Sequence, residues 1–392
     1  MTTQAELDEL TGCEEILGPL RVDAPDRVLL DLRPLSSLLR VDGPLTIGCN
    51  PYLGTDSYCG ESVERSFTLE GLENLESAAS LTLGGLRVSS LAALRSLRDI
   101  GQELNIVNCN ALENLDGLRA PVSTFSFQSN ALLASLVGLT VVPAAERVHI
   151  QGAPALTDLS ALAPLTSVGQ LELREMPLQN LNDVRNLTSL RSLYLIDVPA
   201  LNDVSALDQV RTLDELYLDG TALESLDALQ LESIQALYLA HNPVLLDVDG
   251  LGNLARLGKL DVLSNDNLVR LPAFPNITQL TGVFLQFNAA LSEGPSFPNL
   301  ERMPSGTIAV ADNPKLLRLN GFARLSEVAA IEIRENAQLV EVDFGRLTSA
   351  GRLHITCNPG LAGASLESLT QVSSPDRYLD GNLGSEELCP AL

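Results

Sequence analysis

A nine-residue pattern recurs along almost the whole chain and restricts what the chain can fold into. It reads apolar-x-apolar-x-x-Asn-x-x-Leu, as in Leu237-Tyr-Leu-Ala-His-Asn242-Pro-Val-Leu245. Fifteen copies can be placed, starting at residues 20, 45, 81, 104, 125, 148, 171, 193, 216, 237, 260, 283, 308, 331 and 353. From Leu81 onward the copies are 21 to 25 residues apart. A regular period of this length predicts a stack of similar coils, each of which contacts only its neighbours.

The first half of the pattern predicts a β-strand with an apolar inner side. Apolar residues two positions apart lie on the same side of a strand, so both face the interior of the stack. The Asn stands where the chain leaves the strand, and its amide can pair backbone groups that stacking would otherwise leave buried without partners. The Asn position is filled by Asn50, Asn130, Asn242, Asn265, Asn288, Asn313, Asn336 and Asn358. Elsewhere it is filled by Cys109, Ala153, Met176, Val198 and Thr221, so we expect apolar packing to replace the Asn ladder between residues 153 and 221.

The second half of each repeat carries apolar residues three positions apart, as in Leu156-Thr-Asp-Leu159-Ser-Ala-Leu162. This spacing suits a short helix or a 3-10 turn on the outer side of the coil. A strand inside and a short helix outside, repeated, predict an α/β solenoid that forms a right-handed horseshoe or coil. We expect a cap and first coil over residues 1–44, one continuous array over 45–356, and the last coil with a cap over 357–392. The 36 residues between the copies at 45 and 81 predict an inserted loop at about 54–66.

These repeats resemble the leucine-rich-repeat superfamily over nearly the whole chain. The start, Leu7-Asp-Glu-Leu10-Thr-Gly-Cys13, is similar to the opening of receptor L domains. The middle, about 148–260, is similar to bacterial internalins, with Leu-x-x-Leu-Tyr-Leu at 190–195 and 213–218 and an Ile-led copy at 234–239. The resemblance implies a parallel sheet on the concave inner face and binding of a ligand or partner at a cell surface.

Charge and hydropathy narrow the choice of partners. The chain has 50 acidic and 25 basic residues, a formal charge of -25, and it repels nucleic acid phosphates and anionic membranes. No apolar run is long enough to insert into a membrane. The first ten residues are acidic and do not form a secretory signal, so we expect any export signal or anchor to lie outside this sequence.

The six cysteines favour two disulfide bonds near the ends of the array. Cys49 and Cys59 bracket one short segment, and Cys357 and Cys389 bracket the last one. Two such bridges favour an oxidising compartment and therefore an extracellular or cell-surface location. Cys109 falls at a buried repeat position, and Cys13 has no assigned partner, although it could compete with Cys59 for Cys49.

The residue between the two apolar strand positions points away from the core, so this column predicts the binding surface. Three of the six tyrosines fall here in consecutive coils, and tyrosine is favoured at binding hot spots. Cross-strand aromatic neighbours also stabilise a sheet, so the column has a structural interpretation of equal weight. The candidate partner-binding residues in this column are Glu172, Tyr194, Tyr217, Tyr238, Asp261 and Phe284. Arg174, Asp219 and His241 are candidates in the columns that flank it.

No residues predict an enzyme, a metal site or a bound cofactor. The three histidines lie on distant coils, and a triad of His241, Ser264 and Asp219 lacks an oxyanion site and a means to exclude water. Asp247-Val-Asp249-Gly250 matches only part of a calcium loop. The chain is therefore predicted to be a non-catalytic extracellular recognition module for a protein or glycan. The alternatives are a structural scaffold of the cell envelope without a dedicated ligand and a secreted effector.

Overall fold

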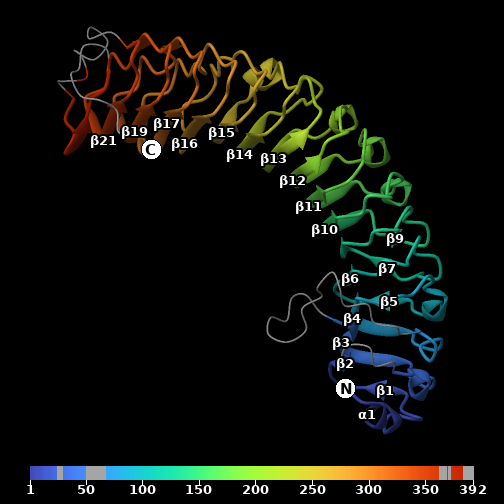
Figure 1. The fold of residues 1–392 in the computed structure, drawn as a ribbon. Coiled ribbons are helices and arrows are strands. Elements are labelled where there is room, and N and C mark those ends of the chain that lie inside the picture. The colour runs from blue at the N-terminus through green and yellow to red at the C-terminus, as the bar shows by residue number, and fades with distance from the viewer. Residues whose placement is uncertain (24–29, 50–67, 362–368, 370–371, 383–392) are drawn as a thin grey trace. The chain divides into compact units, whose positions relative to one another are not determined.

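The computed structural model describes residues 1–23, 30–49, 68–361, 369 and 372–382. The chain divides into two compact units, Met1–Leu190 and Arg191–Leu392, which are described separately. Both are parallel β-solenoids, in which successive coils stack side by side (Figure 1). The predicted division into a cap, an array and a second cap stays a prediction.

The first unit opens with a short helix and continues as strands joined by 3-10 turns (Figure 1). Helix α1 begins after Thr3, and Thr3 and Glu6 form a capping box that pairs the first backbone donors. The elements are α1 (Gln4–Asp8), β1 (Glu15–Ile16), β2 (Leu20–Val22), η1 (Arg33–Leu35), β3 (Arg40–Gly48), β4 (Ser77–Gly84), η2 (Ala92–Leu94), β5 (Asp99–Ile100), β6 (Leu104–Val107), β7 (Pro121–Val122), β8 (Thr124–Gln128), β9 (Thr140–Val141), β10 (Ala144–Gln151), η3 (Ser160–Leu162), β11 (Ser167–Arg174) and η4 (Asn182–Val184).

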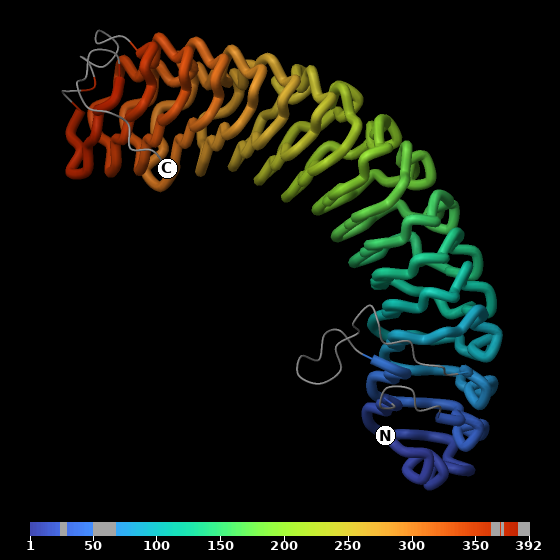
Figure 2. Tube along the Cα trace, viewed as in Figure 1, coloured from blue at the N-terminus to red at the C-terminus, as the bar shows by residue number. Residues whose placement is uncertain are grey.

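The second unit repeats the same coil with longer strands. Its elements are β12 (Ser189–Val198), η5 (Ser205–Leu207), β13 (Thr212–Thr221), β14 (Ser233–Ala240), η6 (Asp249–Asn253), β15 (Arg256–Leu263), β16 (Gly282–Gln286), β17 (Arg302–Ala311), β18 (Arg318–Leu319), β19 (Glu327–Arg334), β20 (Glu341–Val342), β21 (Ser349–Thr356) and β22 (Asp376–Tyr378). In the tube view the successive turns of each unit lie next to one another (Figure 2).

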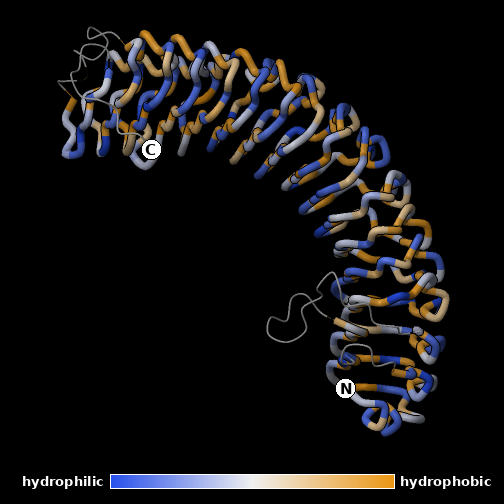
Figure 3. Tube along the Cα trace, viewed as in Figure 1, coloured by the Kyte–Doolittle hydropathy of each residue, from blue (hydrophilic) through white to orange (hydrophobic). Residues whose placement is uncertain are grey.

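The strands pair in parallel and in a register that places equivalent residues side by side. Leu216 pairs with Leu237, and Leu237 pairs with Leu260. All three are fully buried. Burying one leucine side chain contributes about 1.5–3 kcal/mol to the stability of the folded state. Hydrophobic and hydrophilic residues alternate along the tube of both units (Figure 3). The period-two prediction of an apolar interior is therefore confirmed.

The outer side of the coils changes character within the second unit. Its earlier coils use 3-10 helices such as η6, whereas the later ones carry a stack of buried phenylalanines. Phe274 packs on Phe297 with ring centroids 5.1 Å apart, Phe297 on Phe322 at 5.5 Å, and Phe322 on Phe344 at 5.7 Å. These rings fill the space that a helix fills in the earlier coils, so the coils remain closed without one.

The predicted Asn ladder is present and is nearly continuous from Asn242 to Asn382. The Asn313 amide donates to Leu285 O in the preceding coil and to Ala311 O in its own coil, both at 2.9 Å. Its Oδ1 accepts the backbone N–H of Asn288 at 3.1 Å. Asn382 continues the ladder by accepting from the Asn358 backbone at 3.1 Å. Asn50 lies outside the described residues.

Where another residue takes the place of asparagine in the ladder, its own side chain determines which contacts form there. The Cys109 thiol donates weakly to Leu83 O at 3.6 Å, and burial raises its pKa to about 12. The Thr221 hydroxyl donates to Asn242 Oδ1 at 2.6 Å. Ala153, Met176 and Val198 are buried and apolar, which confirms the predicted interruption in these three coils. At Thr221 the prediction of apolar packing is wrong, because its backbone N–H and hydroxyl both donate to Asn242 Oδ1.

The residue before the ladder position adopts a left-handed backbone in coil after coil. Examples are His241 with φ of 48°, Phe287 with 56° and Gly220 with 65°. This conformation turns the chain out of the strand so that the next side chain points inward. Non-glycine residues accept it at a cost of about 1 kcal/mol, which the buried hydrogen bonds of the ladder offset.

We expect Asn313→Ala to lower the free energy of unfolding by about 3 kcal/mol or more, since it leaves several buried backbone groups without partners. Asn299→Ala is the matched control, because Asn299 makes only exposed hydrogen bonds, donating to Pro275 O at 2.8 Å and accepting from Arg324 Nη1 at 3.2 Å. It should cost less than about 1 kcal/mol. Urea unfolding followed by circular dichroism measures both, and equal losses would contradict the structural role of the ladder.

Candidate functional site

The position between the two apolar strand residues forms one column on the open face of each sheet. In the first unit this column is less open than its outward direction suggests. Six members are at least 94% buried, because neighbouring coils and side chains cover them. They are Thr46, Thr82, Asn105, Ser126, His149 and Glu172.

Three members of this column form the polar cluster of the first unit, Ser126, His149 and Glu172. Ser126 Oγ lies 3.0 Å from His149 Nδ1, and Gln128 Nε2 donates to the same Oγ at 2.9 Å. His149 Nε2 faces Glu172 Oε1 at 4.0 Å, too far for a hydrogen bond.

Glu172 is held mainly by Arg174, whose Nε donates to Oε1 at 2.5 Å. Gln170 donates to Oε2 at 3.0 Å, and Arg147 lies 3.8 Å from the same oxygen. The structure thus joins the two candidates Glu172 and Arg174 to each other. Burial restricts what Glu172 can offer a partner, and both residues stay predictions as contacts.

The polar cluster has the residue types of a nucleophilic triad, a combination that the sequence reasoning missed. The signal was available, since Ser, His and Glu occupy one column in three successive coils. Ser126 has no exposed surface, however, so its hydroxyl cannot reach a substrate in this conformation.

Burial lowers the pKa of His149, and Arg147 and Arg174 lower it further, while Glu172 partly opposes them. His149 is therefore neutral in the folded unit near neutral pH. The His149 imidazole is therefore harder to protonate in the folded chain than in the unfolded chain.

In the second unit, side chains of the open face form an aromatic strip, defined as Tyr194, Tyr217, Tyr238, Lys259 and Phe284. Tyr194 stacks on Tyr217 with ring centroids 6.3 Å apart, and Tyr217 stacks on Tyr238 at 5.2 Å. The strand register brings these tyrosines together, since each pairs with the next. All three are partly exposed.

Lys259 fills the gap in the strip that Asp261 leaves. Its Nζ lies 4.5 Å from the ring centroid of Tyr238 and 4.7 Å from that of Phe284. It also pairs with Asp261 Oδ2 at 3.0 Å. Lys259 was not among the predicted residues, because the prediction covered the central column and the positions that follow it along each strand, whereas Lys259 precedes Asp261 by two residues.

Carboxylates flank the aromatic strip. Tyr194 donates from its hydroxyl to Glu215. Asp219 pairs with His241 Nδ1 at 2.9 Å, and the His241 side chain is 56% exposed. His241 is therefore a surface residue on the edge of the strip.

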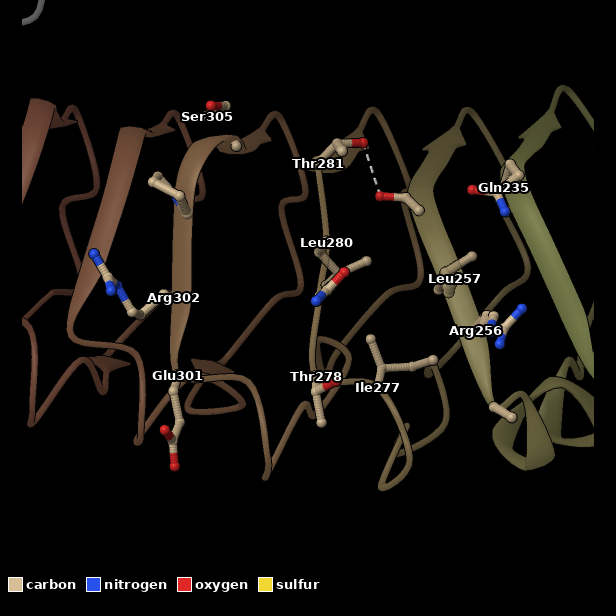
Figure 4. Close-up of a pocket in the computed structure, with 15 residues that line it drawn as sticks. Gln235, Arg256, Leu257, Ile277, Thr278, Leu280, Thr281, Glu301, Arg302 and Ser305 are labelled. Atoms are coloured by element: carbon tan, nitrogen blue, oxygen red, sulfur yellow. Dashed lines mark hydrogen bonds between the residues drawn. The ribbon is translucent and has the colours of Figure 1, made fainter.

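A groove of about 920 Å³ lies beside the starts of the strands in the same unit (Figure 4). Strands β15 and β17 begin at Arg256 and Arg302, whereas β16 begins only at Gly282, and the segment before Gly282 runs between them as irregular chain. Thr281 Oγ1 donates to Gly258 O at 2.8 Å across this region. None of the predicted site residues lines the groove.

Several predictions fall outside these two surfaces. Cys59 and Cys389 lie outside the described residues, so both predicted bridges stay predictions. Cys13 carries a free thiol. Within the described part of the chain, no group of three or more His, Cys, Asp or Glu residues is arranged to hold a metal ion. Across the same residues, no helix has the length and apolarity needed to cross a membrane.

Comparisons with known proteins yield structural likeness alone. No family model matches the chain, and no curated protein matches it. An internalin (InlF) from Listeria monocytogenes is 18% identical with a TM-score of 0.43, over 81% of this chain and 84% of that one. A leucine-rich-repeat protein of Leptospira interrogans is 14% identical with a TM-score of 0.36, over 95% of this chain and 98% of that one.

We expect the polar cluster to make the protein less stable in mild acid. The folded pKa of His149 is below its unfolded value of about 6.5, so its stabilising effect is complete above that pH. It is lost as the pH falls through that value toward the folded pKa, because the unfolded chain then binds more protons. Urea unfolding of the wild type and His149→Gln at pH 8 and pH 5.5 measures this.

The His149→Gln variant should lose less stability between the two pH values than the wild type does. The carboxylates and the other two histidines are the same in both proteins, so the difference isolates His149. An identical loss in both proteins would show that His149 titrates as an ordinary exposed histidine.

Proposed function

We propose that this chain is a non-catalytic recognition module that binds a protein partner through the aromatic strip. The observation that carries the proposal is the contact series along the strip, from Tyr194 to Phe284. It places four aromatic rings and one ammonium on adjacent strands, all partly exposed to solvent. Exposed apolar surface of this kind, bordered by polar groups, is typical of interaction sites.

The physical chemistry of the strip favours binding. Tyrosine offers a large contact area with few rotatable bonds, so little conformational entropy is lost when a partner docks. The rings are already held by their neighbours, which reduces this cost further. The leucines beneath them are fully buried, so the platform itself is rigid.

The charges around the strip favour a partner with basic residues. Glu215, Asp219 and Asp261 lie on or beside it, and the whole chain carries a formal charge of -25. Farther along the unit, burial and the negative charge of the neighbouring Glu335 raise the pKa of Asp312. An acidic field of this kind accelerates association with cationic surfaces and weakens as salt is added.

We place this module outside the cell, at the surface or in the secreted fraction. The support is the pair of disulfide bonds predicted from Cys49, Cys59, Cys357 and Cys389. A non-catalytic role is supported by the burial of Ser126, which lies beside His149 and Glu172 in successive coils.

The proposal is tested by affinity capture from surface and secreted fractions of the source organism and its neighbours. The bait is the wild type or the Tyr194→Ala/Tyr217→Ala/Tyr238→Ala variant, with folding verified by circular dichroism. We expect the variant to lose the partner, with at least a hundredfold weaker binding, because truncation at hot spots costs about 2 kcal/mol or more each.

A matched control removes exposed apolar side chains away from the strip. Leu246, Val269 and Leu317 are 53%, 49% and 43% exposed, and the Leu246→Ala/Val269→Ala/Leu317→Ala variant should keep the partner. If both variants capture the same partner as the wild type, the strip is structural. Capture of a glycan would change the ligand class, and no capture by the wild type would favour the scaffold.

A further inference from the structure

The middle of the aromatic strip already holds an ammonium group, the protein's own. Lys259 Nζ lies within 5 Å of the ring centroids of both Tyr238 and Phe284 and makes an ion pair with Asp261. Two ring faces and one carboxylate are the groups that bind cations most directly, because both present negative charge. The cation site, defined as Tyr238, Asp261 and Phe284, therefore exists in a filled state.

Small residues on both sides create the room for this arrangement. Lys259 pairs in the sheet with Ala236 on one strand and Gly282 on the other. A Cβ on Gly282 would come within 2.4 Å of Cε2 of Phe284, so the ring lies directly against the glycine. Any larger residue at 282 would push the Phe284 ring out of its position over Lys259.

The group that fills the site is a cation. Burial lowers the pKa of Lys259, but Asp261 and Tyr238 together raise it by more, and the net shift is upward. The lysine side chain retains 28% of its exposure, and so does that of Asp261. The site is thus open to solvent on one side, and its occupant is joined to the chain by a flexible stem.

We infer that Tyr238, Asp261 and Phe284 form a binding site for an ammonium or guanidinium group, and that Lys259 is a tethered occupant that competes with a partner's cation. Tethering raises the effective concentration of the occupant to the millimolar range or above. An isolated cation then binds weakly, and a lysine or arginine of a partner enters only when neighbouring contacts help to displace Lys259. Lys259 is therefore a specificity-determining residue of the strip.

The role of this site in partner choice rests on the proposed function, but the site itself can be tested without a partner. The probe is tetramethylammonium, titrated against the wild type and Lys259→Ala and followed by NMR shifts of the Tyr238 and Phe284 rings. We expect Lys259→Ala to bind the probe at least about tenfold more tightly than the wild type, since the rings and the carboxylate become free. Sodium chloride at equal ionic strength is the reference.

Two further experiments distinguish cation binding from nonspecific binding. Neutral tert-butanol, of similar size, should not bind Lys259→Ala with comparable affinity. The Lys259→Ala/Gly282→Ala variant should lose the probe, because the Phe284 ring can no longer lie over the site. Circular dichroism verifies that each variant is folded.

The inference is overturned if Lys259→Ala binds tetramethylammonium no better than the wild type, or if it binds tert-butanol equally well. It is also overturned if the Lys259→Ala/Gly282→Ala variant binds tetramethylammonium as tightly as Lys259→Ala does. None of these results depends on the capture experiment. Failure of the cation site and failure of the partner-binding proposal can therefore be told apart.

Discussion

Stacking the coils of this chain depends on pairing the polar backbone groups that stacking buries. Parallel strands pair most of them, but the turn at the end of each strand leaves carbonyl and amide groups inside the stack. Each ladder asparagine satisfies such groups in its own coil and in the preceding one, as Asn313 does with Ala311 in its own coil and with Leu285 and Asn288 in the preceding coil. A buried group without a partner costs about 1–3 kcal/mol, so the ladder stabilises the register of the coils from Asn242 to Asn382.

That register turns positions in the repeat into columns on the surface. One residue per coil is enough to build a continuous surface, because equivalent residues of adjacent strands lie about 4.8 Å apart. In the second unit the column contains tyrosines and produces a stacked, partly exposed strip. In the first unit the same column contains Ser126, His149 and Glu172 and produces a buried polar cluster. The same backbone thus supports two surfaces of different chemistry.

The repeat predicted much of this because its signal is both local and periodic. The apolar positions, the ladder and its interruption at Ala153, Met176 and Val198 follow from the residue types alone. Asn382 was missed because Arg377 replaces the first apolar residue of its copy, although the register still pairs Arg377 with Leu353. Lys259 was missed because contacts between adjacent columns depend on how a long side chain bends, which periodicity does not describe.

The sequence by itself determined the parallel solenoid, the inward-facing leucines and the alignment of Tyr194, Tyr217 and Tyr238, since each depends only on position within the repeat. Only the tertiary structure decided which outward residues are open and which are buried. Exposure depends on the side chains of neighbouring coils: Glu172 is covered by Arg174 and Gln170, whereas Tyr238 stays partly open. The tertiary structure also decided the position of the Lys259 ammonium between two rings, because that position depends on the small residues Ala236 and Gly282 beside it.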